Sequence, residues 1–157
     1  MHLLADKLHE KGKILSAAVA DGVENGSGIP DETFQYVDFL NIMAYDGDGD
    51  DGHSPYSLAE SALDYWLGRG LPQAKTVLGV PFYARPSWKT YKALLAKGAD
   101  PNVDEFKDES YNGMDTIAQK AKLAIERGSG IVIWELSGDA PEPYSLVSVI
   151  AKVFGEK

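Results

Sequence analysis

The sequence contains no cysteine, which excludes structural disulfide bonds and thiolate metal sites. No apolar run reaches the roughly 18 residues that a membrane-spanning helix needs. Positive charge is also scarce, because 15 lysines and arginines stand against 24 aspartates and glutamates, for a formal net charge of −9. Nucleic acid and anionic membranes would be repelled at long range, so neither is expected as a partner. A neutral ligand is the more natural expectation.

The 157 residues are 44% apolar and 25% charged, which is typical of a single globular domain with its own core. The first twelve residues, MHLLADKLHEKG, carry several charges and no small-residue cleavage site, so we do not expect a signal peptide there. Leu3, Leu4 and Leu8 fall on one face of an expected helix that ends near Gly12.

Four nearly continuous apolar segments predict strands that are covered on both faces. Helices or long crossovers separate them, and this alternation predicts a parallel α/β sheet. The expected strands cover residues 13–20, 36–45, 75–84 and 130–136. The expected helices cover residues 57–67, 91–97, 114–125 and 145–154, with at most one further helical turn after Pro30. Ser57 and Glu60 have the spacing of a capping box at the start of the first of these helices.

Two parallel architectures are compatible with this pattern. A doubly wound sheet is possible, but the segment after the first strand, AVADGVENGSG, lacks the glycine-rich phosphate turn of that fold. A β/α barrel needs eight strands and about 250 residues, so this chain is too short for a whole one.

Aromatic and polar side chains gather where the expected strands end. In parallel α/β folds, function collects at the carboxyl ends of strands. Aromatic rings pack on the C–H faces of sugars, while acids, arginine and phenols bind sugar hydroxyls. The alternative is that these aromatics are simply core residues. The side chains concerned are Met43, Tyr45, Asp46, Phe82, Tyr83, Arg85, Trp134 and Glu135.

Four of these segments resemble family 18 glycoside hydrolases, the chitinase family. VDFLNIMAYD is similar to the sixth strand of that family, with its Met-x-Tyr-Asp signature, VLGVPFYAR to the seventh strand, and GIVIWELSGD to the eighth. KILSAAVA is similar to the fifth. The resemblance implies a partial (β/α)8 TIM barrel, roughly strands 5 to 8 with their helices. Residues 1–157 would then be a single, incomplete domain, the C-terminal part of a catalytic domain.

The resemblance also implies a function: retaining hydrolysis of β-1,4-linked N-acetylglucosamine polymers, in which the acetamido oxygen of the substrate is the nucleophile. Tyr45 and Asp46 would be the catalytic residues, with the Tyr45 hydroxyl bonded to the acetamido oxygen. The substrate-binding residues would be Met43, which lines the pocket, Tyr83 and Arg85, which bind sugar hydroxyls, and Trp134, which stacks under the ring. No cofactor and no metal is implied. The expected partner is a chitooligosaccharide or a related glycan, and the family alone suggests a secreted or cell-surface location.

The catalytic string of that family, Asp-x-x-Asp-x-Asp-x-Glu at the end of its fourth strand, does not occur in these residues. We therefore expect this chain by itself to lack the general acid and to be inactive, with the upstream half of its own barrel as a partner. Glu135 is not expected to replace the acid, because strand alternation points it away from Trp134. Two alternatives remain: a non-catalytic, lectin-like relative, and a half-barrel that self-associates through its open sheet edges.

Two segments have more than one interpretation. The loop after Asp46 has aspartates at calcium-loop spacing, but Asp51 and Ser57 stand where the glycine and the bidentate glutamate of such a loop belong. We favour a divided interpretation, in which Asp46 belongs to the sugar site while Asp48, Asp50 and Asp51 form a flexible, solvated loop at its mouth. His53 is interpreted as a loop residue, because no other histidine lies at ligand spacing. Residues 86–113 contain further aromatics that extend a sugar platform or form a buried cap. These are Trp88, Tyr91 and Tyr111.

Overall fold

The main sheet of the computed structural model, which describes residues 1–47 and 52–155, has four parallel strands. In chain order they are β1 (Ser16–Ala20), β2 (Phe39–Met43), β3 (Thr76–Pro81) and β6 (Gly130–Trp134). They lie side by side in the order β1-β2-β3-β6, so β1 and β6 are the outer strands. All four predicted strands and their parallel arrangement are confirmed, although each strand is shorter than the apolar segment that predicted it.

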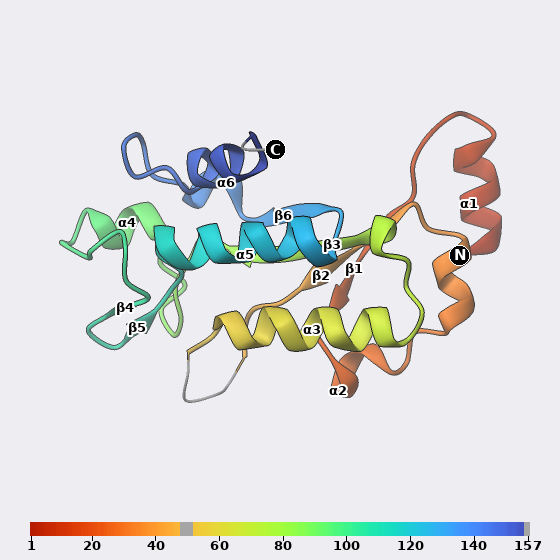
Figure 1. Cartoon of the computed structure of the whole chain (residues 1–157), viewed down its shortest axis with the longest axis horizontal. Helices are drawn as coiled ribbons and strands as arrows, with labels where there is room; N and C mark the ends of the chain where they lie inside the picture. Colours follow the sequence, from red (N-terminus) through yellow and green to blue (C-terminus); the bar gives the residue numbers. More distant parts are fainter. Residues whose placement is uncertain (48–51, 156–157) are drawn as a thin grey trace.

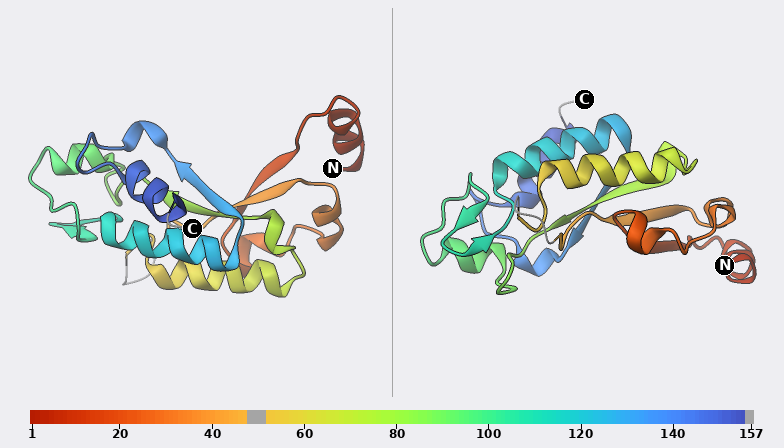
Figure 2. Two further views of the ribbon diagram at one scale, coloured as in Figure 1. Left: turned by 45° about the horizontal axis from the view of Figure 1, so that its top comes forward. Right: turned by 90° about the horizontal axis from the view of Figure 1, so that it is seen from below.

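Three long helices, α3 (Tyr56–Gly68), α5 (Met114–Arg127) and α6 (Leu146–Gly155), follow strands. Helices α3 and α5 pack on the sheet, and α6 packs on α5. Figures 1 and 2 show α3 and α5 side by side along the sheet, with α6 next to α5. Among the described residues, no helix is long and apolar enough to cross a membrane.

The shorter elements lie toward the two ends of the molecule (Figure 1). Helix α1 (His2–His9) is at one end, while α4 (Tyr91–Leu95) and a hairpin of β4 (Glu105–Phe106) and β5 (Glu109–Ser110) are at the other. The part of the chain that the structure describes also contains helix α2 (Val23–Gly26) and three 3-10 turns, which are Asp31–Gln35, Gln73–Lys75 and Leu136–Gly138.

The two faces of the sheet have different environments. Side chains that point toward α3 and α5 are fully buried, including Leu40 and Ile42 of β2 and Leu78 of β3. Trp66 of α3 belongs to the same core, and its indole N–H donates to the backbone oxygen of Ala20 at 2.9 Å. The alternate residues point to the opposite face and are only partly buried; they include Asn41, Met43 and Val132. The second face is therefore available for a ligand.

Several local predictions were wrong. Ser57 and Glu60 form no capping box, because α3 begins at Tyr56 after Pro55 and has no side-chain cap. In α1, Leu3 is 79% exposed and the buried residue is Ala5, since this helix touches the core by one narrow edge only. Helix α2 and the β4–β5 hairpin were not predicted, because elements of two to four residues have too little periodicity to detect.

Gly79 of β3 has no room for a side chain, because the backbone of β2 and the ring of Tyr45 lie close to its Cα atom. A Cβ atom at this position would lie 2.4 Å from the Ile42 backbone oxygen and 3.0 Å from the Tyr45 ring. Gly79→Ala is therefore expected to lower the free energy of unfolding by on the order of 1 kcal/mol or more, which chemical denaturation would measure. Gly130→Ala is the matched control, because its Cβ would meet nothing within 4 Å. Equal stability of the two variants would contradict the steric argument.

Candidate functional site

A cavity of about 420 Å³ lies at the carboxyl ends of the strands, on the open face of the sheet. Four of the six predicted site residues line it: Met43, Tyr45, Asp46 and Trp134. They meet because all four strands are parallel and end near one another. Ala20 is opposite Met43, Ile42 is opposite Leu78 and Pro81 is opposite Trp134, so Tyr45 and Asp46, just beyond β2, come close to the ends of β3 and β6. The remaining lining residues are Ala18, Asn41, Trp88 and Val132.

The other two predicted site residues contact Asp46 from the end of β3. The Tyr83 hydroxyl donates to Asp46 Oδ1 at 2.8 Å, and the Arg85 guanidinium donates to the same oxygen at 3.0 Å. Asp46 has a left-handed backbone, with φ of 65°, which a short polar side chain tolerates better than most. Burial, followed by the bond to Asp46, raises the pKa of the Tyr83 hydroxyl far above its ordinary value, so Tyr83 remains a donor.

Tyr45 and Trp134 present an apolar wall with one polar group. Burial, followed by the charge of Asp46, raises the pKa of the Tyr45 hydroxyl, which keeps it protonated and able to donate. The Trp134 side chain is 59% exposed at the end of β6, so its indole face is open to a ligand. This combination of a ring surface and a hydroxyl donor is suited to a sugar with an amide substituent.

The aromatic residues of segment 86–113 divide between a buried cap and the cavity. Tyr91 and Tyr111 are each only 1% exposed, and they belong to a buried cap. Trp88 is 58% exposed and lines the cavity. Its ring stacks on Tyr83 with centroids 5.3 Å apart, and the Arg85 guanidinium lies 4.1 Å from its centre. Trp88 therefore extends the aromatic surface of the site.

His53 lies in a loop, as we predicted, but its side chain is buried. It is 3% exposed, and its Nε2 lies 3.2 Å from the Tyr83 backbone oxygen. The neighbouring Ser54 is equally buried, and Lys120 of α5 donates to it. The sequence around His53 is polar and rich in glycine, so no local pattern indicated that His53 and Ser54 are buried.

No group of three or more His, Cys, Asp or Glu residues that could hold a metal ion occurs among the described residues. The calcium-loop hypothesis concerned Asp48, Asp50 and Asp51, which lie outside the described residues. Glu135 is exposed, accepts a hydrogen bond from the Ser137 hydroxyl and does not line the cavity.

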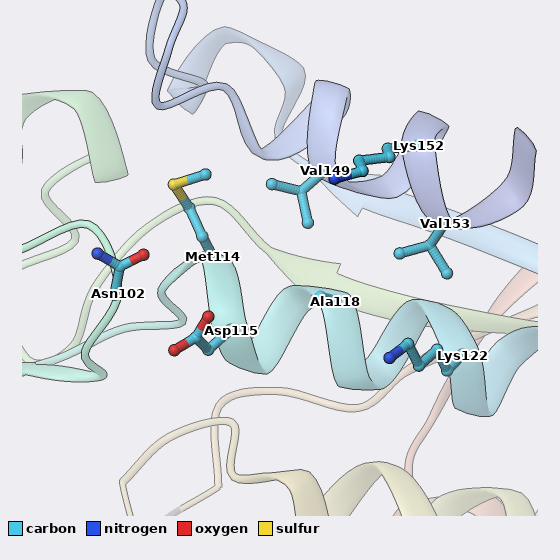
Figure 3. A pocket seen from close by; sticks show the side chains of 8 residues that line it. All are labelled: Asn102, Met114, Asp115, Ala118, Lys122, Val149, Lys152 and Val153. Carbon is cyan, nitrogen blue, oxygen red and sulfur yellow. The ribbon is translucent and has the colours of Figure 1, made fainter. Parts of the chain in front are cut away.

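A second cavity, of about 390 Å³, lies between α5 and α6 (Figure 3). It contains no aromatic ring, and no residue at a strand end contributes to it. It therefore lacks the features that suggest sugar binding in the first cavity. Its lining residues are Asn102, Met114, Asp115, Ala118, Lys122, Val149, Lys152 and Val153.

Sequence reasoning missed Ala18, Asn41 and Val132 as lining residues of the first cavity. Asn41 lies two residues before Met43, and Val132 lies two residues before Trp134. Ala18 is paired with Asn41 on the neighbouring strand. In strands that are apolar on both faces, this alternation is hidden, because core and cavity residues look alike.

The parallel strands, the open aromatic cavity at their carboxyl ends and the helices on the other face define one part of a β/α barrel. A family model for glycosyl hydrolases family 18 matches residues 2–139. The chain belongs to this family. The predicted fold class, a partial (β/α)8 barrel, is confirmed.

Individual relatives agree with the family assignment. Chitinase 1 of Aphanocladium album is 26% identical over 92% of this chain and 46% of its own length. The GH18 chitinase ChiB from the chitin utilization locus of Flavobacterium johnsoniae superposes with a TM-score of 0.90 at 31% identity, over 98% of this chain and 54% of that one. This chain thus spans about half the length of these relatives.

A plant class V chitinase mutant from Cycas revoluta, solved in complex with (GlcNAc)3, superposes with a TM-score of 0.79 at 20% identity. The alignment covers 98% of this chain and 61% of the plant chain. At this identity the likeness concerns the fold alone.

Proposed function

We propose that this chain supplies the sugar-binding and acetamido-positioning side of a chitinase-like glycoside hydrolase. The carrying observation is the cavity in which Trp134, Tyr45, Asp46 and Met43 meet at the carboxyl ends of the parallel strands. The substrate would be a β-1,4-linked N-acetylglucosamine polymer. The Cycas revoluta relative, solved with (GlcNAc)3, supports a chitooligosaccharide as the ligand to test.

The proposed mechanism is retaining and substrate-assisted, so the protein has to orient the acetamido group and protonate the leaving oxygen. Tyr45 would donate to the acetamido oxygen, since its raised pKa keeps the hydroxyl protonated. Asp46, held by Tyr83 and Arg85, would contact the sugar next to it. Trp134 would form the floor under the ring. None of these groups supplies the acid, so this chain alone is expected to bind the sugar without cleaving it.

The test is calorimetric titration of the chain with chitotriose, together with an assay for cleavage of a fluorogenic chitooligosaccharide. We expect saturable binding and no cleavage. Tyr45→Phe should weaken binding about three- to tenfold, which corresponds to one lost hydrogen bond of roughly 1 kcal/mol. Tyr36→Phe, at the amino end of β2 and outside the cavity, is the control and should bind as the original chain does.

Two results would change the proposal. Absence of binding would remove the sugar-binding role. Cleavage that Tyr45→Phe abolishes would show that the chain has a catalytic acid of its own. If a form that also carries the other half of the barrel binds the sugar and does not cleave it, the lectin-like alternative takes the place of the hydrolase.

A further inference from the structure

The imidazole of His53 is buried behind the sugar-facing cavity. Its ring lies 5.2 Å from the Tyr83 ring, and its Nε2 is 3.2 Å from the Tyr83 backbone oxygen. A carbonyl oxygen only accepts hydrogen bonds, so this contact requires a proton on Nε2. A neutral imidazole has one ring proton, and Nδ1 therefore carries a lone pair.

That lone pair faces Asp46. Nδ1 of His53 lies 3.7 Å from Asp46 Oδ1, and it is buried without a hydrogen-bond partner. The same carboxylate oxygen accepts bonds from Tyr83 and Arg85 on its other sides. A lone pair and a carboxylate repel each other, whereas one added proton would join them in a charge-assisted hydrogen bond. A single proton on Nδ1 of His53 would therefore turn the contact with Asp46 from repulsive to attractive.

The backbone around His53 is fixed on both sides. The Ser54 hydroxyl donates to the Ala44 backbone oxygen at 2.7 Å, and Lys120 donates to both Ser54 oxygens at 2.7 Å. The Gly47 amide donates to the His53 backbone oxygen at 2.9 Å. These bonds tie the segment after β2 to α5, so His53 has little freedom to move away from Asp46.

The charged and titratable groups around His53 come from four elements of the described chain. Burial lowers the pKa of the imidazole and outweighs the charge of Asp46, which raises it. Lys120 and Arg85 lower it further. His53 is therefore neutral at pH 7. The groups that face it or share its surface cavity are Asp46 after β2, Tyr83 and Arg85 after β3, Asp108 of the β4–β5 hairpin and Lys120 of α5.

We propose that His53 is a positioning residue for the sugar site. As a neutral imidazole it donates to the backbone oxygen of Tyr83, just after β3. In this form it does not compete with Tyr83 and Arg85, whose hydrogen bonds hold the Asp46 carboxylate. When it takes up a proton, it draws the Asp46 carboxylate inward through a new Nδ1–H···Oδ1 bond and away from the sugar. This inference deepens the proposed function, on which its sugar-binding part rests, and it gives the site a dependence on acid that belongs to His53.

The first experiment needs no sugar. Long-range proton–nitrogen NMR spectra can resolve all rings, because the chain has only three histidines, and His53→Gln assigns the buried one. We expect a proton on Nε2 at pH 8 and a pKa below 6.5, the ordinary value. In Asp46→Asn the pKa of His53 should fall further, since the stabilising anion is gone. A proton on Nδ1, or a pKa that Asp46→Asn leaves in place, would overturn the proposal.

The second experiment titrates chitotriose at pH 7 and pH 5. His53→Ala should weaken binding about tenfold at pH 7, since the Tyr83 backbone loses the hydrogen bond and the packing that the imidazole supplies. His53→Gln should restore most of the lost affinity, because its amide still donates to the Tyr83 carbonyl. It should also remove the part of the pH dependence that belongs to His53, because it does not titrate. His2→Gln, at an exposed histidine of α1, is the control.

The outcomes separate the two proposals. If the original chain binds no sugar, the proposed function fails, and the NMR titration alone decides the coupling of His53 to Asp46. If the original chain binds but His53→Ala matches it in affinity and in pH profile, the positioning role is refuted while the proposed function stands. Circular dichroism and unfolding curves of each variant confirm that it is folded.

Discussion

Trp134→Ala is expected to weaken binding of chitotriose about 30-fold, the largest effect on binding of any single change at the site. The indole is 59% exposed at the end of β6, so a sugar ring laid on it would cover apolar surface that is now in water. Full burial of a large apolar side chain stabilises by roughly 1.5–3 kcal/mol, and about 2 kcal/mol corresponds to this factor. Isothermal calorimetry at pH 7 measures it.

Two controls make the Trp134 result specific. Trp134→Phe keeps a ring at the position and should lose much less affinity than the alanine variant. Tyr144→Ala removes another exposed aromatic, 47% accessible and outside the cavity lining, and should leave binding unchanged. An alanine variant that binds within about twofold of the original would show that Trp134 is not the floor of the site. Because the side chain is largely exposed, the fold should survive all three changes.

The second large effect is a rise in stability with pH that depends on Lys120. This lysine of α5 is 0% exposed and donates to three acceptors at 2.7 Å, which are Ser54 O, Ser54 Oγ and Asn112 Oδ1. Burial lowers its pKa to about 7 from 10.5, and the more distant charge of Asp104 opposes the shift. The three acceptors match the three donors of an ammonium group, so the buried site is built for the charged form at a cost in solvation.

The direction of the pH effect follows from the two pKa values of Lys120. Between pH 7 and about 10.5 the unfolded chain holds a proton that the folded chain has released. The free energy of unfolding therefore rises with pH in this window, by at most about 1.4 kcal/mol per pH unit. Between pH 7 and 9 the expected gain is about 2 kcal/mol. Above pH 10 the raised pKa values of buried tyrosines, such as Tyr111 at about 12, work in the opposite direction.

Urea denaturation at pH 7, 8 and 9 tests the role of Lys120. Lys120→Met keeps the approximate length of the side chain but does not titrate, so its stability should lack the rise. Lys122→Met, at an exposed position of the same helix, should keep it. If Lys120→Met becomes more stable with pH just as the original chain does, the rise belongs to another group.

The strands of the sheet could be predicted because each is a continuous apolar segment, and such a segment is recognised without knowing which strands lie beside it. The lengths were overestimated for the same reason: Phe82 to Ala84 are as buried as β3 itself, although they lie beyond its last residue, Pro81. Burial and strand pairing are separate properties, and a strand ends where its backbone pairing stops, even if the following residues are still buried.

The predicted site residues could be named from the sequence because family signatures place them at strand ends. Their roles in catalysis and binding stay predictions until sugars and variants are measured. What the signatures could not indicate was the support behind them. His53 and Ser54 come from a loop, and Lys120 comes from a helix 66 residues after Ser54. All three are polar, and each looks like a surface group in its own segment.

The sequence by itself thus determined the class of fold, the order of the strands along the chain and which side chains stand at their ends. These properties follow from short-range patterns, namely apolar runs and the residues that directly follow them. The tertiary structure alone decided that Trp88 joins the cavity while Tyr91 and Tyr111 are buried, and that His53 reaches Asp46 from behind. Those outcomes depend on contacts between segments distant in sequence, where the neighbours of a side chain, and not its own type, set its burial and its charge.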